Sequence, residues 1–385
     1  MSVTDKWEDR VMRAAHPLAF PALSALKKPV TRVPGLGVVV LDAGLIRSTL
    51  LDTNSFSKIG KGAPSDIWTP LLGPSVLLNM EGKDHQQLRR RLAPLFTPSY
   101  VNDLVNNSLG EVTRRLTERL VRGETVDVVA EARHYASIAI SNLVGLPESA
   151  TDDEFFRSVT SVTSFVTLTR PRMSSAQLRR AREVLAGISA HADRAYDAGD
   201  EKTVPGRMRA LGFSRDESRG IVGAFVVAGT ETLVAFIPRM VCLLSDSGWL
   251  ARLAAQPELS EMVIAEALRV VTPSPVMLRC AIADSHIGGQ RVKTGDRVIL
   301  GTYWGNRGLE GFDPQSSKAA SLKQLWFGAG PHFCIGAPLA MTQIRLVLGA
   351  IAAAEHRAPL TVTHREPSRR VLIPGYQSVR LGKLS

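Results

Sequence analysis

Apolar residues recur at intervals of three and four along most of the chain between about residues 84 and 270. The clearest stretches are 109–122, 175–198 and 216–244. This interval places apolar side chains on one face of an α-helix, where they can pack against a core. The pattern therefore predicts that helices make up most of the middle of the chain.

Strand-like segments lie towards the two ends instead. Residues 38–41 are all apolar and mostly β-branched, and residues 292–300 alternate around a predicted turn at 293–296. Together with the helical middle, they predict a mainly α fold with a smaller β-rich portion.

The length of the chain leaves its domain organisation open. Its 385 residues are 44% hydrophobic, and a chain of this size can bury one large core or divide into two or three domains. No repeat or low-complexity linker marks a boundary, and the polar loop at 198–206 is too short for an interdomain tether. We therefore expect one integrated domain.

Several features predict a cytoplasmic protein that does not enter a membrane. The first ten residues are polar and charged, without the apolar segment of a signal peptide. The longest apolar run, residues 221–237, is interrupted by polar residues and is shorter than the roughly 20 residues of a membrane-spanning helix. Cys242, Cys280 and Cys334 form neither a disulfide framework nor a zinc-binding spacing. We expect Cys242 and Cys280 to be core residues.

The formal net charge of +11 raises the possibility of nucleic-acid binding. The positive residues are dispersed, however, and no zinc knuckle, basic zipper or aromatic RNA-binding motif accompanies them. We therefore predict no nucleic-acid partner.

Cys334 stands in a glycine-rich loop ahead of a helix-forming run. Gly328, Gly330 and Gly336 allow the backbone to turn tightly and to approach a flat ligand. The helix N-terminus that follows favours a thiolate, which could ligate a metal such as haem iron. A lone cysteine in such a loop can also be a buried structural residue. The local pattern leaves both possibilities open.

A second unusual segment interrupts the apolar run at 221–237. Gly229 costs a helix about 1 kcal/mol relative to alanine, and the hydroxyls of Thr230 and Thr232 can compete for carbonyls one turn back. The segment predicts a distorted or widened helical turn.

The two segments together resemble the motifs of a known family. The sequence FGAGPHFCIG at 327–336, with AGTET at 228–232 upstream, is similar to the haem-binding and distal-helix motifs of the cytochrome P450 family, soluble bacterial type. The resemblance runs from about residue 34 to the C-terminus. It implies the cytochrome P450 fold in a single domain at 34–385, with residues 1–33 as an extension packed on that domain.

The resemblance also implies the cofactor and the site. The cofactor would be haem b, with Cys334 as the axial ligand of its iron. Glu231 and Thr232 match the acid and the alcohol that deliver protons on the distal side. The other residues that the resemblance assigns to cofactor binding are His85, Arg89, Ala228, Arg279, Phe327, Gly328, His332 and Gly336.

Four of these residues match partners of the haem propionates. His85 and Arg89 are four residues apart and share a helical face. Arg279 and His332 match the remaining two partners, and a guanidinium suits a partly buried carboxylate.

Glu266 and Arg269 match a buried pair that holds the family's fold together, so we assign them no catalytic role. In the family a further arginine joins this pair, but residues 312–326 contain none. Lys318 and Lys323 are the candidate substitutes, although lysine lacks the forked geometry of a guanidinium.

The implied activity is that of a haem-thiolate monooxygenase that hydroxylates or otherwise oxidises an apolar small molecule, in secondary metabolism. Electrons would come from NAD(P)H through a ferredoxin or similar partner, and the basic residues 89–91 would form its docking face. By analogy, the segments expected to line the substrate pocket are 65–78, 155–169, 225–228, 275–278 and the turn near Tyr376.

Two alternatives remain open at the level of sequence. A peroxide-driven haem enzyme would replace the acid and alcohol pair with an anchor for a substrate carboxylate, and Glu231 and Thr232 argue against it. A catalytically silent protein that keeps the fold and binds haem or a partner would carry the same motifs.

Overall fold

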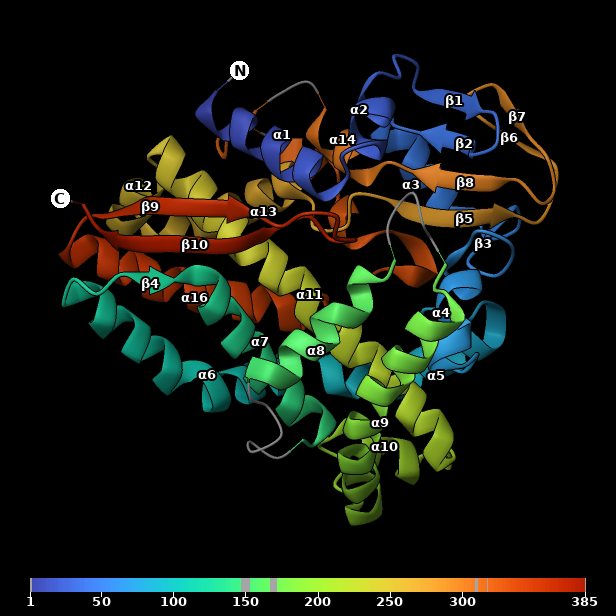
Figure 1. The fold of residues 1–385 in the computed structure, drawn as a ribbon, viewed down its shortest axis with the longest axis horizontal. Helices are drawn as coiled ribbons and strands as arrows, with labels where there is room; N and C mark the ends of the chain where they lie inside the picture. The colour runs from blue at the N-terminus through green and yellow to red at the C-terminus, as the bar shows by residue number, and fades with distance from the viewer. Residues whose placement is uncertain (1, 147–152, 167–171, 309–310, 317, 385) are drawn as a thin grey trace.

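The structure of the chain, a computed structural model, describes residues 2–146, 153–166, 172–308, 311–316 and 318–384. Helix α11 (Arg215–Ser247) runs diagonally through the middle of Figure 1. It begins with a capping box in which Ser214 and Glu217 each bond the other's backbone N–H, and it ends at the left-handed Gly248. The helix predicted at 216–244 is therefore confirmed, with slightly wider bounds.

Other helices surround α11, as the apolar spacing predicts. The stretch at 175–198 is α9, and that at 109–122 lies largely within α6. Helix α7 packs against α11 on one side, and α6 packs against α16. The other described α-helices are α1 (Val3–Ala15), α2 (Ala19–Ser24), α3 (Ala43–Leu51), α4 (Pro64–Leu72), α5 (Gly82–Leu92), α6 (Pro98–Val121), α7 (Val128–Val144), α8 (Asp153–Ser164), α9 (Ser175–Ala198), α10 (Val204–Ala210), α12 (Trp249–Ala255), α13 (Ser260–Val271), α14 (Thr302–Arg307), α15 (Lys318–Ser321) and α16 (Ala337–Arg357).

A five-stranded sheet joins segments from both halves of the chain, seen in Figure 1 as blue strands beside orange ones. Strand β2 pairs in parallel with β8, and β5 pairs with β8 and β3. The strands predicted at 38–41 and 292–300 are confirmed in outline, and the turn between β7 and β8 closes through Asp296 N–H and Lys293 O at 2.9 Å. The order in this sheet is β1 (Val30–Val33), β2 (Gly37–Val40), β8 (Arg297–Leu300), β5 (Met277–Ala281) and β3 (Phe56–Ser57).

The remaining described strands form two smaller sheets. The C-terminal strands β9 (Leu360–Pro367) and β10 (Tyr376–Lys383) make an antiparallel pair that β4 (Val126–Asp127) extends. Strands β6 (Ser285–Ile287) and β7 (Gln290–Val292) form a hairpin. The mainly α fold with a smaller β-rich portion is thus confirmed.

The helical turn predicted to be distorted is regular, so that prediction was wrong. Helix α11 is continuous through Gly229. The hydroxyls of Thr230 and Thr232 donate to Val226 O at 2.8 Å and Ala228 O at 3.2 Å, so they share these carbonyls without displacing the backbone bonds. A Cβ on Gly229 would lie 3.1 Å from Cδ1 of Ile140. The glycine therefore serves the close approach of α7.

Two described helices, α11 and α16, are long and apolar enough to cross a membrane by length and composition alone. Of their most apolar windows, 56% and 50% respectively are buried within the fold. Packing in the core accounts for their apolar character.

The Glu266–Arg269 pair is buried at the end of α13, as expected. Arg269 donates to both carboxylate oxygens of Glu266 at 2.7 Å. Its remaining donors bond the carbonyls of Asn306, Arg307 and Gly311, and Glu266 also accepts from Asp313 N–H at 2.9 Å. Main-chain groups of residues 306, 307, 311 and 313 thus bond this pair.

The N-terminal segment is anchored by a second buried pair. Helix α1 packs against α11 and β9, and Glu8 on α1 accepts hydrogen bonds from Arg239 on α11, whose side chain is 0% exposed. Strand β1, within the segment 1–33, pairs with β2. The domain boundary at residue 33/34 stays a prediction.

We expect Glu8→Ala to lower the free energy of unfolding by about 3–5 kcal/mol, because it leaves Arg239 buried without its carboxylate. The matched control is Asp9→Ala on the same helix, which removes a largely exposed pair with Arg13 and should cost less than about 1 kcal/mol. Urea unfolding of both variants measures the difference. Equal costs for the two variants would show that the buried pair does not anchor α1.

Candidate functional site

The loop around Cys334 is a tight turn that depends on glycine at two positions. Gly328 and Gly330 have φ angles of +83° and +67°, which side chains rarely adopt. A Cβ on Gly330 would also lie 3.1 Å from Leu50 O. Cys334 N–H donates to Phe327 O at 2.9 Å and closes the loop. The chain then enters α16 through Pro338.

The thiol of Cys334 is accessible although it lies inside the molecule. It lines a cavity of about 670 Å³. Burial raises the pKa of this thiol, while hydrogen bonds from the N–H groups of Gly336 and Ala337 and the charges of Arg89 and Lys58 act in the opposite direction. The N–H groups at the helix terminus thus favour the thiolate form of Cys334, as predicted. In the protein alone, however, desolvation has the larger effect on the pKa of the thiol.

The opposite wall of this cavity is α11. Ile221, Ala224, Phe225 and Ala228 face the loop across the cavity, and Ala228 is exposed to it. Helix α5 adds polar groups, because His85 and Arg89 line the same space. The fold therefore brings Ala228, His85, Arg89, His332 and Cys334 around one cavity.

The predicted catalytic pair lies further along α11. Thr232 is one helical turn beyond Ala228, to whose carbonyl its hydroxyl donates. Glu231 lines a different cavity, together with Arg133 and Tyr376. Neither Glu231 nor Thr232 is therefore among the described residues that line the cavity that holds the Cys334 thiol.

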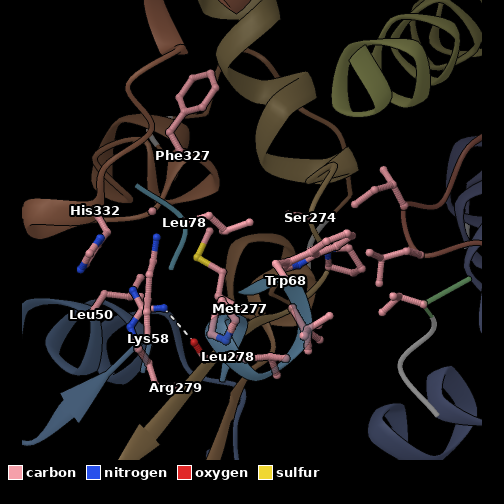
Figure 2. Close-up of a pocket in the computed structure, with 18 of the residues that line it drawn as sticks. Leu50, Lys58, Trp68, Leu78, Ser274, Met277, Leu278, Arg279, Phe327 and His332 are labelled. Atoms are coloured by element: carbon pink, nitrogen blue, oxygen red, sulfur yellow. Dashed lines mark hydrogen bonds between the residues drawn. The ribbon is translucent and has the colours of Figure 1, made fainter. Parts of the chain in front are cut away.

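A second, larger cavity of about 1060 Å³ adjoins the first and shares Lys58, Leu78 and His332 with it. Figure 2 shows the nitrogen-bearing side chains of Lys58, Arg279 and His332 gathered at one end, with Trp68 and Ser274 towards the other. Most of the remaining lining is apolar.

The predicted pocket segments are represented in part. Ile67, Trp68, Leu78, Val166 and all of 275–278 line the larger cavity, and Phe225 and Ala228 line the smaller one. Residues 167–169 of the predicted segment 155–169 lie outside the described residues. Phe327 and Gly328, predicted as cofactor contacts, also line the larger cavity.

Positive charge gathers where the two cavities meet. Lys58, Arg89 and Arg279 lie there with His85 and His332, whose rings are 4.1 Å apart. The one carboxylate on this cluster among the described residues is Glu81, which bonds His332 Nε2 at 2.6 Å and accepts from Lys58 N–H at 2.5 Å.

The charges in this cluster are poorly neutralised. Burial is the main cause that lowers the pKa of Lys58 to about 7, of Arg279 to about 10 and of His85 to about 4, with neighbouring cations contributing for Lys58 and His85. Arg279 is 4% exposed and donates to the carbonyl of Leu278 (dashed line in Figure 2). Nδ1 of His332 is buried without a hydrogen-bond partner among the described residues. The cluster is therefore suited to bind an anion.

Comparisons with known proteins agree with this geometry. The cytochrome P450 family model matches residues 254–352. Cytochrome P-450 monooxygenase DoxA from Streptomyces sp. (strain C5) is 28% identical and covers 90% of this chain and 87% of its own. Erythromycin C-12 hydroxylase from Saccharopolyspora erythraea is 27% identical, over 80% of this chain and 79% of its own. The chain belongs to the cytochrome P450 family.

The fold comparison shows that the chain has the same fold as a solved cytochrome P450. The structure of the cytochrome P450 enzyme CYP109B1 from Bacillus subtilis superposes with a TM-score of 0.78 at 23% identity, over 96% of this chain and 100% of its own. The protein is a P450 monooxygenase, and its family implies a haem iron. The residues present fit that group. The accessible thiol of Cys334 could ligate the iron, and the buried Nδ1 of His332, which has no hydrogen-bond partner among the described residues, could bond a carboxylate of the cofactor.

Sequence reasoning missed Lys58. No local motif marks it, because its position follows from the pairing of β3 with β5, which sets Phe56 opposite Ala281 and Ser57 opposite Cys280. That pairing brings Lys58 beside Arg279 in this P450. Arg297 on β8, which also lines the larger cavity, was missed for the same reason. Leu372 and Ile373 line this cavity too, and they lie just before Tyr376, in the neighbourhood of the predicted turn.

The lowered pKa of His85 gives this P450 an acid-sensitive site. In the cofactor-free protein, the folded state resists protonation of His85 until about pH 4, whereas the unfolded state binds that proton near pH 6.5. Stability is therefore lost as pH falls through this window. The free energy of unfolding should fall between pH 7 and pH 4.5 in both proteins, and we expect the fall to be about 2 kcal/mol smaller in His85→Gln than in the wild type.

Chemical unfolding of the cofactor-free protein at both pH values measures this effect. His286→Gln on β6 is the control, because His286 is exposed and should leave the pH dependence unchanged. The same pH dependence in His85→Gln and in the wild type would contradict the prediction.

Proposed function

We propose that this P450 monooxygenase oxidises an apolar small molecule in secondary metabolism, with hydroxylation as the default reaction. The observation that carries the proposal is the accessible Cys334 thiol, which faces α11 across a cavity that adjoins a larger and mostly apolar one. Erythromycin C-12 hydroxylase, a relative of this chain, supports both the reaction and the metabolic setting.

The cofactor in this proposal is haem b, with Cys334 as the iron ligand. Arg279, Arg89, His85 and His332 would hold its carboxylates, and Phe327, Gly328, Gly336 and Ala228 would contact it. When bound, haem supplies the reductive activation of dioxygen and the transfer of one oxygen atom to a C–H bond. The protein positions the substrate beside it and excludes water.

Proton delivery is assigned to Thr232 and Glu231. Thr232 is one turn from Ala228, which lines the Cys334 cavity, so its hydroxyl can hold a proton at the edge of that space. Glu231 faces the neighbouring cavity with Arg133 and Tyr376. It can pass protons from that side of α11 to the threonine.

Electrons come from NAD(P)H through a ferredoxin-type partner in the cytoplasm. Arg90 and Arg91 are exposed on α5, the helix that also carries Arg89 to the cavity. An acidic partner is attracted to such a surface, and its association should weaken with rising salt.

Turnover with NADPH, a ferredoxin reductase and a surrogate ferredoxin, over a panel of apolar substrates, tests the proposal. We expect oxygenated product in the wild type. In Thr232→Val we expect the product formed per NADPH oxidised to fall about tenfold or more, because a positioned proton donor is lost. Thr230→Val is the control, because its hydroxyl makes the same bond to a carbonyl one turn back but is buried.

Product supported by hydrogen peroxide but not by the ferredoxin system would favour the peroxide-driven alternative. A haem-loaded protein that consumes no NADPH with any substrate would favour the catalytically silent one. Equal product yield per NADPH in Thr232→Val and Thr230→Val would contradict a role for Thr232 in proton delivery.

A further inference from the structure

Arg297 lies at the boundary between the interior cavity and an outer one. The larger cavity, described above, and an outer cavity of about 1040 Å³ share Val276, Leu278 and Arg297 as common lining. The outer cavity is otherwise apolar, with Leu18 and Leu36 among its lining residues. Arg297 is thus the one charged residue, among the described residues, that lines both cavities.

The guanidinium of Arg297 has no carboxylate partner among the described residues. Its Nε is buried without a hydrogen-bond partner. The nearby carboxylate of Asp66 is already engaged, because it accepts from Gly62 N–H at 2.9 Å and from Arg172 at 2.8 Å. Burial also lowers the pKa of Arg297, although Asp66 opposes the shift.

The stem of this arginine is held in place by two glycines. A Cβ on Gly62 would lie 2.8 Å from Cδ and 3.3 Å from Nε of Arg297. A Cβ on Gly37 would lie 2.2 Å from its carbonyl oxygen. Gly62 therefore packs directly against the side chain of Arg297, and Gly37 packs against its main chain.

The other cations of the larger cavity have a different role. Lys58 and Arg279 lie with His332 and Glu81, and the proposed function assigns that end of the cavity to the cofactor carboxylates. Arg297 belongs to the outer wall instead. A half-buried arginine whose Nε has no hydrogen-bond partner among the described residues, set in a largely apolar lining, is suited to a ligand that pairs one carboxylate with an apolar body.

We propose that Arg297 binds the carboxylate of the substrate, and that this P450 takes apolar monocarboxylic acids with their apolar part in the larger cavity. This inference rests on the proposed function for the location of the reaction. The binding step itself involves no bond-making and can be measured without turnover.

The test is calorimetric titration of the haem-loaded protein with two probes, dodecanoate and dodecan-1-ol, which share a chain length and differ in charge. We expect the wild type to bind dodecanoate at least tenfold more tightly than the alcohol. In Arg297→Gln this preference should fall to within twofold, and Arg297→Lys should retain part of it, because the charge remains without the fork.

Arg291→Gln is the matched control, because Arg291 is exposed on β7 and pairs with Asp284. It should keep the full preference. Equal affinities for the two probes in the wild type, no binding of either probe, or a preference that survives in Arg297→Gln would overturn the inference. The wild-type comparison needs no variant, so it decides the question even if Arg297→Gln fails to fold.

The same titrations separate this inference from the proposed function. If the protein prefers dodecanoate through Arg297 but forms no oxygenated product, the carboxylate site is supported and the proposed reaction is contradicted. If the protein forms oxygenated product but shows no preference for dodecanoate, the proposed reaction is supported and the carboxylate site is contradicted.

Discussion

Buried positive charge without a matching protein anion is the constraint on which the site depends. Lys58, Arg89 and Arg279 surround the junction of the two cavities, with Glu81 as the carboxylate on the cluster in the described part of the chain. Such a cluster destabilises the protein alone, because the single carboxylate of Glu81 is set against three desolvated cations. A dianionic cofactor bound between the cavities would offset that cost. The instability of the empty site and the affinity of the filled one therefore have the same origin.

The fold holds this cluster in place through contacts distant in sequence. Pairing of β3 with β5 sets Lys58 beside Arg279, and the Cys334 loop is held against α3 through Gly330 and Leu50. Behind the loop, Arg269 ties α13 to the carbonyls of residues 306, 307 and 311. These contacts fix the positions of the elements around the Cys334 loop.

The sequence was sufficient to predict the helices, because their apolar period is strong. The Cys334 loop was also predictable, because glycine spacing and a helix start are local signals. The close approach of Ile140 to Gly229 was not predictable, since Ile140 comes from another helix. The positions of Lys58 and Arg297 depend on strand pairing, which no local pattern encodes. The assignment of Glu231 came from resemblance, which did not predict that its side chain lines a separate cavity with Arg133 and Tyr376.

The central claim is that Cys334 is the axial ligand of a haem iron. The carbon monoxide difference spectrum of the reduced protein tests it most directly, because carbon monoxide reports on the ligand across the iron. Cys334→Ser should be compared with Cys280→Ala, a buried cysteine outside both cavities. The account predicts a red-shifted, thiolate-type Soret band in the wild type and in Cys280→Ala that is lost in Cys334→Ser. A histidine-type band common to all three proteins, or a wild type that binds no haem, would contradict it.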